Sequence, residues 1–151
     1  MDLSKCPLFA EFTPAELSGL KAITQRTLLD PGTTAFREGE AGDNLVVIST
    51  GTLRLTKSGP AGDEEELAVL GSGAYVGEMA LFGAGRRSAT GTALERTELA
   101  FIGYATLQAL LEANPPTAAK FYKAVAAGTT KRLRAMNDNV AFLKAFLRAR
   151  A

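Results

Sequence analysis

The sequence predicts a mainly β domain with flanking helices, whose strands form an antiparallel sandwich or barrel. Between Thr24 and Ile102, short runs of β-branched and apolar residues alternate with turns that contain glycine, which is typical of many short antiparallel strands. On both sides of this region, apolar residues recur instead at helical spacing. The length of 151 residues fits one domain with a substantial core.

An N-terminal helix is predicted over residues 7–23. Thr13 suits the N-cap position, Pro14 suits the first helical position, and Glu16 completes a capping box. Apolar side chains then follow at helical spacing: Leu17, Leu20 and Ile23. The segment therefore carries both a helix start signal and an apolar face.

One segment of the β-rich region shows the pattern of a half-buried strand. Leu53 and Leu55 alternate there with the polar residues Thr52, Arg54 and Thr56. Because successive side chains of a strand point to opposite faces, we expect the two leucines to face the core. Glycine-bearing turns separate the predicted strands: PGTT, GEAGD, GPAGDEE, GSG and GAG.

Two helical segments are predicted after the strands. Residues 104–113 return to helical spacing, and the run Asn-Pro-Pro at 114–116 ends that helix. An apolar stripe then continues from Phe121 to Leu147. Gly128 lies in a gap of this stripe, and glycine costs about 1 kcal/mol relative to alanine inside a helix. We therefore expect a kink or a break near Gly128.

The composition excludes several classes of enzyme. The sequence contains no histidine, which removes Ser-His-Asp and Cys-His catalysis and histidine-ligated zinc. Cys6 is the single cysteine, so no internal disulfide can form and a reducing compartment is expected. Since the sequence also shows no P-loop and no cluster of metal ligands, we expect a protein that is not an enzyme and carries no cofactor or metal.

The sequence shows no feature that would take the chain into a membrane. No run of about 18 or more apolar residues is present. The N-terminus also lacks the apolar stretch of a signal peptide. We therefore expect no membrane span and a cytoplasmic location.

Charge is distributed unevenly along the chain. Residues 1–115 contain 9 basic and 15 acidic side chains, whereas residues 116–151 contain 8 basic side chains and a single acid. The basic segment is either a surface for an acidic partner or nucleic acid, or a solvated helix face that complements its own acidic domain. The segment lacks interleaved aromatic residues and a recognition helix, so DNA binding is not favoured.

The stretch GEMALFGAGRRSAT, which begins at Gly77, is the densest group of potential ligand-binding residues. Gly77 permits a positive φ or a close approach to the backbone, and the carboxylate of Glu78 can accept hydrogen bonds from a sugar diol. The apolar run 79–82 can begin a helix whose free N–H groups attract an anion. Arg87, followed by Ser88, offers a planar fork of donors suited to phosphate oxygens. Together these groups suit a phosphate joined to a ribose.

This stretch resembles the phosphate-binding cassette of cyclic nucleotide-binding domains. That cassette starts with Gly-Glu-x-Ala-Leu and ends with Arg, a small residue and Ala, and the nine-residue spacing from Glu78 to Arg87 is the same. The resemblance extends over about residues 8–135. It also includes four segments outside the cassette: Pro31-Gly32, residues 36–40, residues 43–48 with Gly51, and residues 70–73.

The resemblance implies a role for each candidate residue. Glu78 would bind the ribose 2′-hydroxyl, Arg87 the cyclic phosphate, and Ser88 would add a hydroxyl to the phosphate or to a guanine. The remaining cassette positions, which would supply backbone or pocket wall, are Gly77, Met79, Ala80, Leu81 and Ala89. The positions that would line or cover the base are Leu55, Leu67, Ala68, Thr129, Thr130, Arg132 and Arg134. The alternatives are a structural ion pair between Glu78 and Arg87, and simple core or surface positions for the others.

The resemblance also implies an architecture. Residues 1–115 would form an antiparallel β-roll or jelly-roll barrel with flanking helices. Residues 116–151 would form a C-terminal helical lid or output segment of the same domain. The 15 residues after position 136 are too few for the winged helix-turn-helix of the family's transcription factors, so a stand-alone domain is expected.

The function implied is that of a cyclic nucleotide receptor, with cyclic AMP favoured over cyclic GMP. Ligand binding would reposition the C-terminal helix towards a protein partner or a second copy of the chain. The alternative is a degenerate scaffold of the same fold that binds proteins without a ligand.

Overall fold

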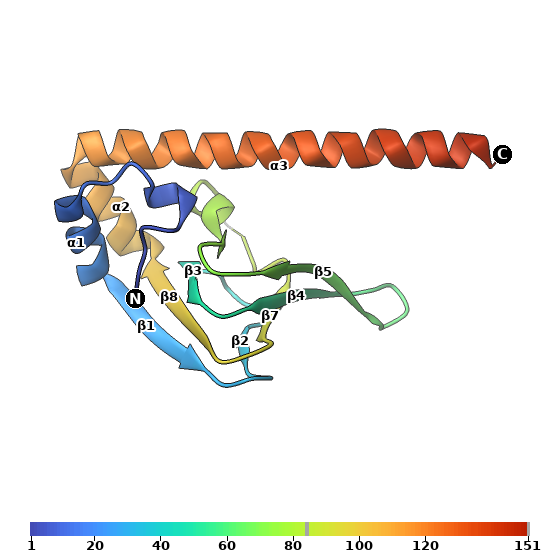
Figure 1. Ribbon diagram of the computed structural model, residues 1–151, viewed down its shortest axis with the longest axis horizontal. Helices are drawn as coiled ribbons and strands as arrows, with labels where there is room; N and C mark the ends of the chain where they lie inside the picture. The colour runs from blue at the N-terminus through green and yellow to red at the C-terminus, as the bar shows by residue number, and fades with distance from the viewer. Residues whose placement is uncertain (84, 151) are drawn as a thin grey trace.

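The computed structural model, which describes residues 1–83 and 85–150, contains two four-stranded antiparallel sheets flanked by helices (Figure 1). The strand orders are β1-β8-β3-β6 and β2-β7-β4-β5. The strands are β1 (Thr24–Leu29), β2 (Thr34–Phe36), β3 (Asn44–Thr50), β4 (Leu53–Ser58), β5 (Glu64–Leu70), β6 (Tyr75–Val76), β7 (Thr90–Ala93) and β8 (Thr97–Gly103). The predicted fold class is thereby confirmed, although the two sheets do not close into a continuous barrel.

The predicted alternation in β4 holds only for its first half. Leu53 is fully buried, and Leu55 is half-buried. The pairing between β4 and β5 shifts register between Leu55 and Thr56, whereas the pairing of β4 with β7 stays regular through Thr56, whose side chain is buried. Its hydroxyl donates a hydrogen bond to Glu64 Oε1 at 2.6 Å, so the buried polar group is satisfied.

The N-terminal segment forms two short helices rather than the single predicted helix. A 3₁₀ turn, η1 (Pro7–Phe9), precedes helix α1 (Pro14–Ala22). The predicted capping box is confirmed: the Thr13 hydroxyl accepts from the Glu16 amide, and the Glu16 carboxylate accepts from the Thr13 amide.

Helix α3 (Pro115–Ala149) is one continuous helix, so the predicted kink or break at Gly128 is wrong. It follows α2 (Tyr104–Ala113), which ends before the Asn-Pro-Pro run as expected. A Cβ atom at position 128 would lie 2.3 Å from the Tyr75 hydroxyl oxygen. The glycine therefore serves a close approach between α3 and β6 rather than a bend in the helix.

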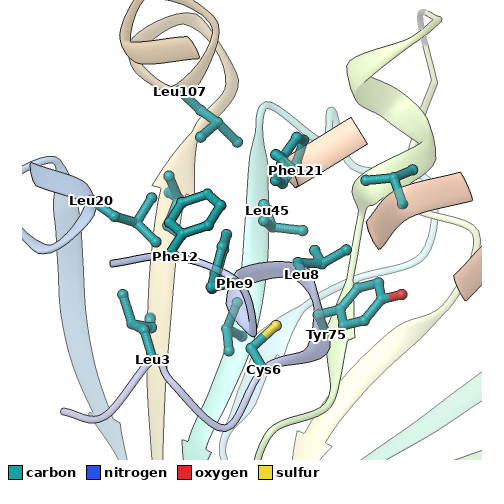
Figure 2. Packing of buried hydrophobic residues seen from close by; sticks show 14 of the residues in the cluster. Leu3, Cys6, Leu8, Phe9, Phe12, Leu20, Leu45, Tyr75, Leu107 and Phe121 are labelled. Carbon is teal, nitrogen blue, oxygen red and sulfur yellow. The ribbon is translucent and has the colours of Figure 1, made fainter. Parts of the chain in front are cut away.

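The hydrophobic core has two parts. One lies between the sheets and contains Leu29, Phe36, Val46, Ile48, Leu53, Ala93 and Leu99. The other joins the N-terminal segment, the three helices and one sheet, with Phe9 and Phe121 stacked at a centroid distance of 6.2 Å (Figure 2). Cys6 lies in this second cluster, and burial raises the pKa of its thiol to about 12.

Helix α3 is anchored at one end only. Phe121 and Val125 are buried, whereas every described residue from Thr129 onward is exposed. Figure 1 shows the helix as a straight rod that starts beside α1 and α2, crosses above the sheets and extends beyond them. Within the described residues, no helix has the length and apolar character of a membrane span.

Glu16 connects the start of α1 to the anchored end of α3. Its carboxylate pairs with Lys120 Nζ at 2.5 Å and accepts a hydrogen bond from the Thr117 hydroxyl. The hydrogen bond from Lys120, followed by that from Thr117, lowers the pKa of Glu16 to about 2. These contacts between the two helices are therefore strongest while Glu16 is ionised.

We expect Gly128→Ala to destabilise the wild-type protein but to stabilise the Tyr75→Phe variant. In the wild-type protein the new methyl group meets the Tyr75 hydroxyl, and overpacking of this kind costs about 1–3 kcal/mol. In a Tyr75→Phe background the obstacle is removed, and alanine should stabilise the helix by up to about 1 kcal/mol. Urea unfolding of the four proteins tests this. Stabilisation by alanine in the wild-type background would contradict the described contact.

The contribution of Glu16 to stability should depend on pH. Its pKa is about 2 in the folded protein and 4.5 as the ordinary value, so the stabilisation is complete above pH 4.5 and lost as the pH falls towards 2. Urea midpoints of wild type and Glu16→Gln should therefore differ at pH 6 and converge at pH 2. Glu11→Gln, which removes the exposed pair with Lys123, is the control and should have a smaller effect at pH 6.

Candidate functional site

The predicted cassette forms one wall of a pocket with a volume of about 390 Å³. Ten of the predicted site residues line it: Leu55, Ala68, Gly77, Glu78, Met79, Ala80, Arg87, Ser88, Ala89 and Arg132. Eight further residues complete the lining: Phe36, Gly42, Leu70, Tyr75, Val76, Gly85, Arg86 and Tyr104. The pocket thus brings together strands of both sheets, the cassette and one side chain of α3.

The cassette begins at a backbone conformation that favours glycine. Gly77 has a φ of +93°, and a single 3₁₀ turn, η2 (Glu78–Leu81), follows directly. A Cβ atom at position 77 would lie 2.7 Å from Arg87 Nη1 and 2.9 Å from the Tyr104 hydroxyl oxygen. The absence of a side chain therefore allows Arg87 and Tyr104 to pack directly against the start of the cassette.

Arg87 is held in place by contacts within the domain. Its Nη2 donates to the main-chain oxygen of Asn44 at 2.9 Å and to the Asn44 side-chain oxygen. The guanidinium carbon lies 5.0 Å from the centre of the Phe36 ring. These contacts fix one edge of the planar fork and leave Nη1 on the side of Gly77.

Glu78 is buried, with 3% of its surface exposed, and it pairs with Arg132 of α3. The alternative of a structural pair between Glu78 and Arg87 is therefore wrong. The Arg132 guanidinium carbon also lies 4.9 Å from the centre of the Tyr75 ring. The carboxylate at the start of the cassette is thus contacted from the C-terminal helix.

Arg86 and Ser88, on either side of Arg87, are both exposed at the pocket. Arg86 Nη1 donates to the Gly39 carbonyl at 2.8 Å. The main chain at Arg87 pairs with the same loop, since its amide donates to the Glu40 carbonyl at 2.8 Å. The loop around Gly39 therefore supports the arginine end of the cassette.

Five predicted residues do not line this pocket. Thr129 and Thr130 belong instead to a second, shallow hollow of about 460 Å³, together with Phe82, Tyr122, Val125, Ala126 and Leu133. Leu67 is 54% exposed on β5, Arg134 is exposed on α3, and Leu81 packs against the hydrophobic core.

Asn44, Tyr75 and Tyr104 contribute to the site although their roles were not predicted. The Tyr104 hydroxyl donates to the Gly77 carbonyl, and burial raises the pKa of both tyrosines above its ordinary value. No local motif marks them, because antiparallel pairing brings them together: Asn44 lies opposite Gly103, next to Tyr104, and Val47 lies opposite Tyr75.

The charges at the pocket favour an anion that also carries hydroxyl groups. Three arginines, Arg86, Arg87 and Arg132, line the pocket with a single carboxylate, Glu78. Arginine binds phosphate oxygens through parallel hydrogen bonds, and a carboxylate accepts hydrogen bonds from hydroxyl groups. The apolar wall at Leu55, Ala68 and Leu70 suits a flat apolar group.

Comparison with known families identifies this arrangement. Residues 26–114 match the model of the cyclic nucleotide-binding domain, a range that includes the complete cassette and all strands except the start of β1. The chain belongs to the cyclic nucleotide-binding domain family. The matched range of this cyclic nucleotide-binding domain includes Glu78 and Arg87, which both line the pocket.

Three relatives illustrate the similarity. The chain is 39% identical over 93 residues to the cyclic AMP receptor protein of Thermus thermophilus, covering 62% of this chain and 43% of that protein. It is 26% identical over 141 residues to a CRP-like cAMP-activated global transcriptional regulator of Mycobacterium tuberculosis. That match covers 93% of this chain and 61% of the relative. The chain also superposes on the crystal structure of the N-terminal domain of a transcriptional regulator from Streptomyces coelicolor A3(2), with a TM-score of 0.77 and 38% identity. The superposition covers 91% of this chain and 94% of that domain. The chain thus spans less than two thirds of the first two relatives.

We expect Gly77→Ala to destabilise the cyclic nucleotide-binding domain more than Gly62→Ala does. Both glycines have a positive φ, so each alanine incurs a backbone cost of about 1–2 kcal/mol. Only at position 77 would the new methyl group also crowd Arg87 and Tyr104, which adds about 1–3 kcal/mol. Urea unfolding measures the difference. Equal losses in the two variants would show that the close packing at Gly77 is unimportant.

Proposed function

We propose that this chain is a cyclic nucleotide receptor domain that binds cyclic AMP in the pocket of the cassette. The observation that carries this proposal is the fixed guanidinium of Arg87, which lies in an open pocket of about 390 Å³ together with the buried carboxylate of Glu78. A pocket of this size falls within the range that encloses small ligands.

The groups that line the pocket match the parts of a cyclic nucleotide. The cyclic phosphate would accept hydrogen bonds from Arg87, whose guanidinium is already oriented by Asn44 and Phe36. The ribose 2′-hydroxyl would donate to Glu78. The base would lie against the apolar wall formed by Leu55 and Ala68. No rearrangement of Arg87 is needed before binding, which lowers the entropic cost.

Cyclic AMP is favoured over cyclic GMP. The Thermus and Mycobacterium relatives are named for cyclic AMP, which supports this choice. Ser88, exposed at the pocket, would give a hydroxyl to the phosphate, or to a guanine if cyclic GMP binds. The open pocket also supports a ligand-binding domain over a scaffold that has lost its ligand.

The same proposal gives α3 the role of output element. Its distal half exposes apolar side chains at steps of three and four: Leu133, Met136, Val140, Leu143 and Leu147. An uncovered stripe of this spacing suits a partner helix or a second copy of α3. We expect the domain to work in the cytoplasm, in line with its single, buried free thiol.

Arg87→Ala should weaken binding of cyclic AMP by about a hundredfold or more, because two charge-assisted hydrogen bonds are lost. Calorimetric titration with cyclic AMP and cyclic GMP, on protein checked for nucleotide carried over from expression, measures both ligands. Arg96→Ala is the control and should change affinity by no more than about threefold, since this exposed arginine lies outside the pocket. Absence of binding by the folded, nucleotide-free wild type would contradict the proposal.

If α3 pairs with a second copy of itself, Leu143→Lys should abolish self-association. The substitution would place a charge where the apolar stripes of the two helices meet. Ala145→Lys is the control, since residue 145 lies about 200° around the helix from residue 143. Sedimentation velocity over a range of concentrations, with and without cyclic AMP, reports the oligomeric state. A wild type that stays monomeric throughout would rule out the second copy and leave a partner helix.

A further inference from the structure

The pocket carries more positive charge than a cyclic phosphate requires. Among the described residues that line it, Arg86, Arg87 and Arg132 are basic and Glu78 is acidic. Arg132 pairs with Glu78, so the charges of Arg86 and Arg87 are not balanced by a side chain of the pocket. A cyclic phosphate is a phosphodiester and bears one negative charge. Since Arg87 already serves the phosphate of the proposed ligand, Arg86 is the cation in excess.

Arg86 is held beside the pocket by the loop around Gly39. Its Nη1 donates to the Gly39 carbonyl at 2.8 Å, and its main chain pairs with Ala41. The side chain is exposed, and no acidic side chain pairs with it in the part of the chain that the structure describes. A guanidinium has several N–H donors, so the bond to Gly39 leaves donors for the oxygens of an anion.

A phosphate monoester would use this excess charge. At neutral pH a monoester carries a charge close to about −2, because its second pKa is about 6. Hydrolysis of a cyclic nucleotide produces such a monoester: the oxygen of water bonds to phosphorus, one P–O ester bond breaks, and the released ribose oxygen takes a proton. The product keeps the base and the ribose 2′-hydroxyl. Arg86 and Arg87 both line the pocket and would share the two charges of the phosphate.

We propose that the pocket also binds adenosine 5′-monophosphate (AMP), the hydrolysis product of cyclic AMP, and that Arg86 is the residue that determines affinity for this second ligand. The inference rests on the proposed cyclic nucleotide function and extends it to a ligand of higher charge. Because both nucleotides would occupy one pocket, each excludes the other. The receptor would then respond to the ratio of cyclic AMP to its hydrolysis product.

The first test is calorimetric titration of the full chain with AMP and with cyclic AMP at neutral pH. The wild type should bind both, with affinities within about tenfold of each other, and AMP should displace bound cyclic AMP. Arg86→Gln removes the charge but keeps an amide donor for the Gly39 carbonyl. This variant should lower the ratio of AMP affinity to cyclic AMP affinity by about tenfold.

Two control variants separate the charge of Arg86 from its support of the loop. Arg86→Lys keeps the charge and should change the affinity ratio by no more than about threefold. Arg96→Gln removes an equal charge from an exposed position outside the pocket and should leave the ratio unchanged. Circular dichroism confirms that each variant is folded.

The pH dependence of binding is a second readout, which a purely structural role of Arg86 would not produce. AMP gains its second charge between about pH 5 and pH 7.5, whereas cyclic AMP keeps a single charge throughout. The affinity of the wild type for AMP should rise about fivefold over this range, and Arg86→Gln should reduce the rise to about twofold or less.

Cyclic AMP, titrated over the same range, reports any titration of the protein itself. The chain contains no histidine, which is the side chain that ordinarily titrates there. Tyr75 and Tyr104 line the pocket, and burial raises the pKa of both further above its ordinary value of 10. In the supporting loop, the carboxylates of Glu38 and Glu40 accept hydrogen bonds from main-chain amides. Titration of these acids, or of Glu78, would change binding of both nucleotides.

The outcomes distinguish this inference from the proposed function. If the folded, nucleotide-free wild type does not bind cyclic AMP, the proposed function fails. If it binds cyclic AMP but binds AMP more than about a hundredfold more weakly, the second ligand is overturned and the proposed function stands. If Arg86→Gln weakens both nucleotides equally, or the affinity for AMP does not change with pH, the role of Arg86 in selecting the ligand is overturned.

Discussion

The contact between Gly128 of α3 and the hydroxyl of Tyr75 determines how the helix and the pocket lie relative to each other. Tyr75 belongs to β6, whose partner β3 also presents Asn44 to Arg87. A Cβ atom at position 128 would crowd the Tyr75 hydroxyl, and one helical turn further along Arg132 reaches Glu78. A wider crossing would leave a buried carboxylate without its partner, and buried charges are costly when unpaired. The geometry of the ligand site thus depends on one missing side chain outside the cassette.

The two charged residues of the cassette are stabilised in different ways. Arg87 is oriented from the β-sheets, by Asn44 and Phe36, and is independent of α3. Glu78 is paired from α3 alone within the described residues. The arginine end of the cassette is therefore held by the β-sheets, whereas its carboxylate end is contacted from the helix.

The predictions that succeeded concern residues close together in the chain. The capping box of Thr13 and Glu16 is a local pattern, and it appears in the structure as expected. Glu78 and Arg87 are also close in the chain, and both line one pocket. The predictions that failed were overruled by distant partners. The low helix propensity of Gly128 predicts a break in the helix. In the structure the helix continues through Gly128, and the glycine instead lies close to the Tyr75 hydroxyl. The buried hydroxyl of Thr56 depends on Glu64 of β5, a partner that single-strand alternation cannot anticipate.

The one-sided anchoring of α3 makes the helix a lever. At a rise of 1.5 Å per residue, the part beyond Gly128 is roughly 30 Å long. A tilt of about 5° at the crossing would move the far end by about 3 Å, enough to take an apolar side chain out of register with a neighbouring helix. A small change of angle at this crossing is therefore amplified along the exposed part of the helix.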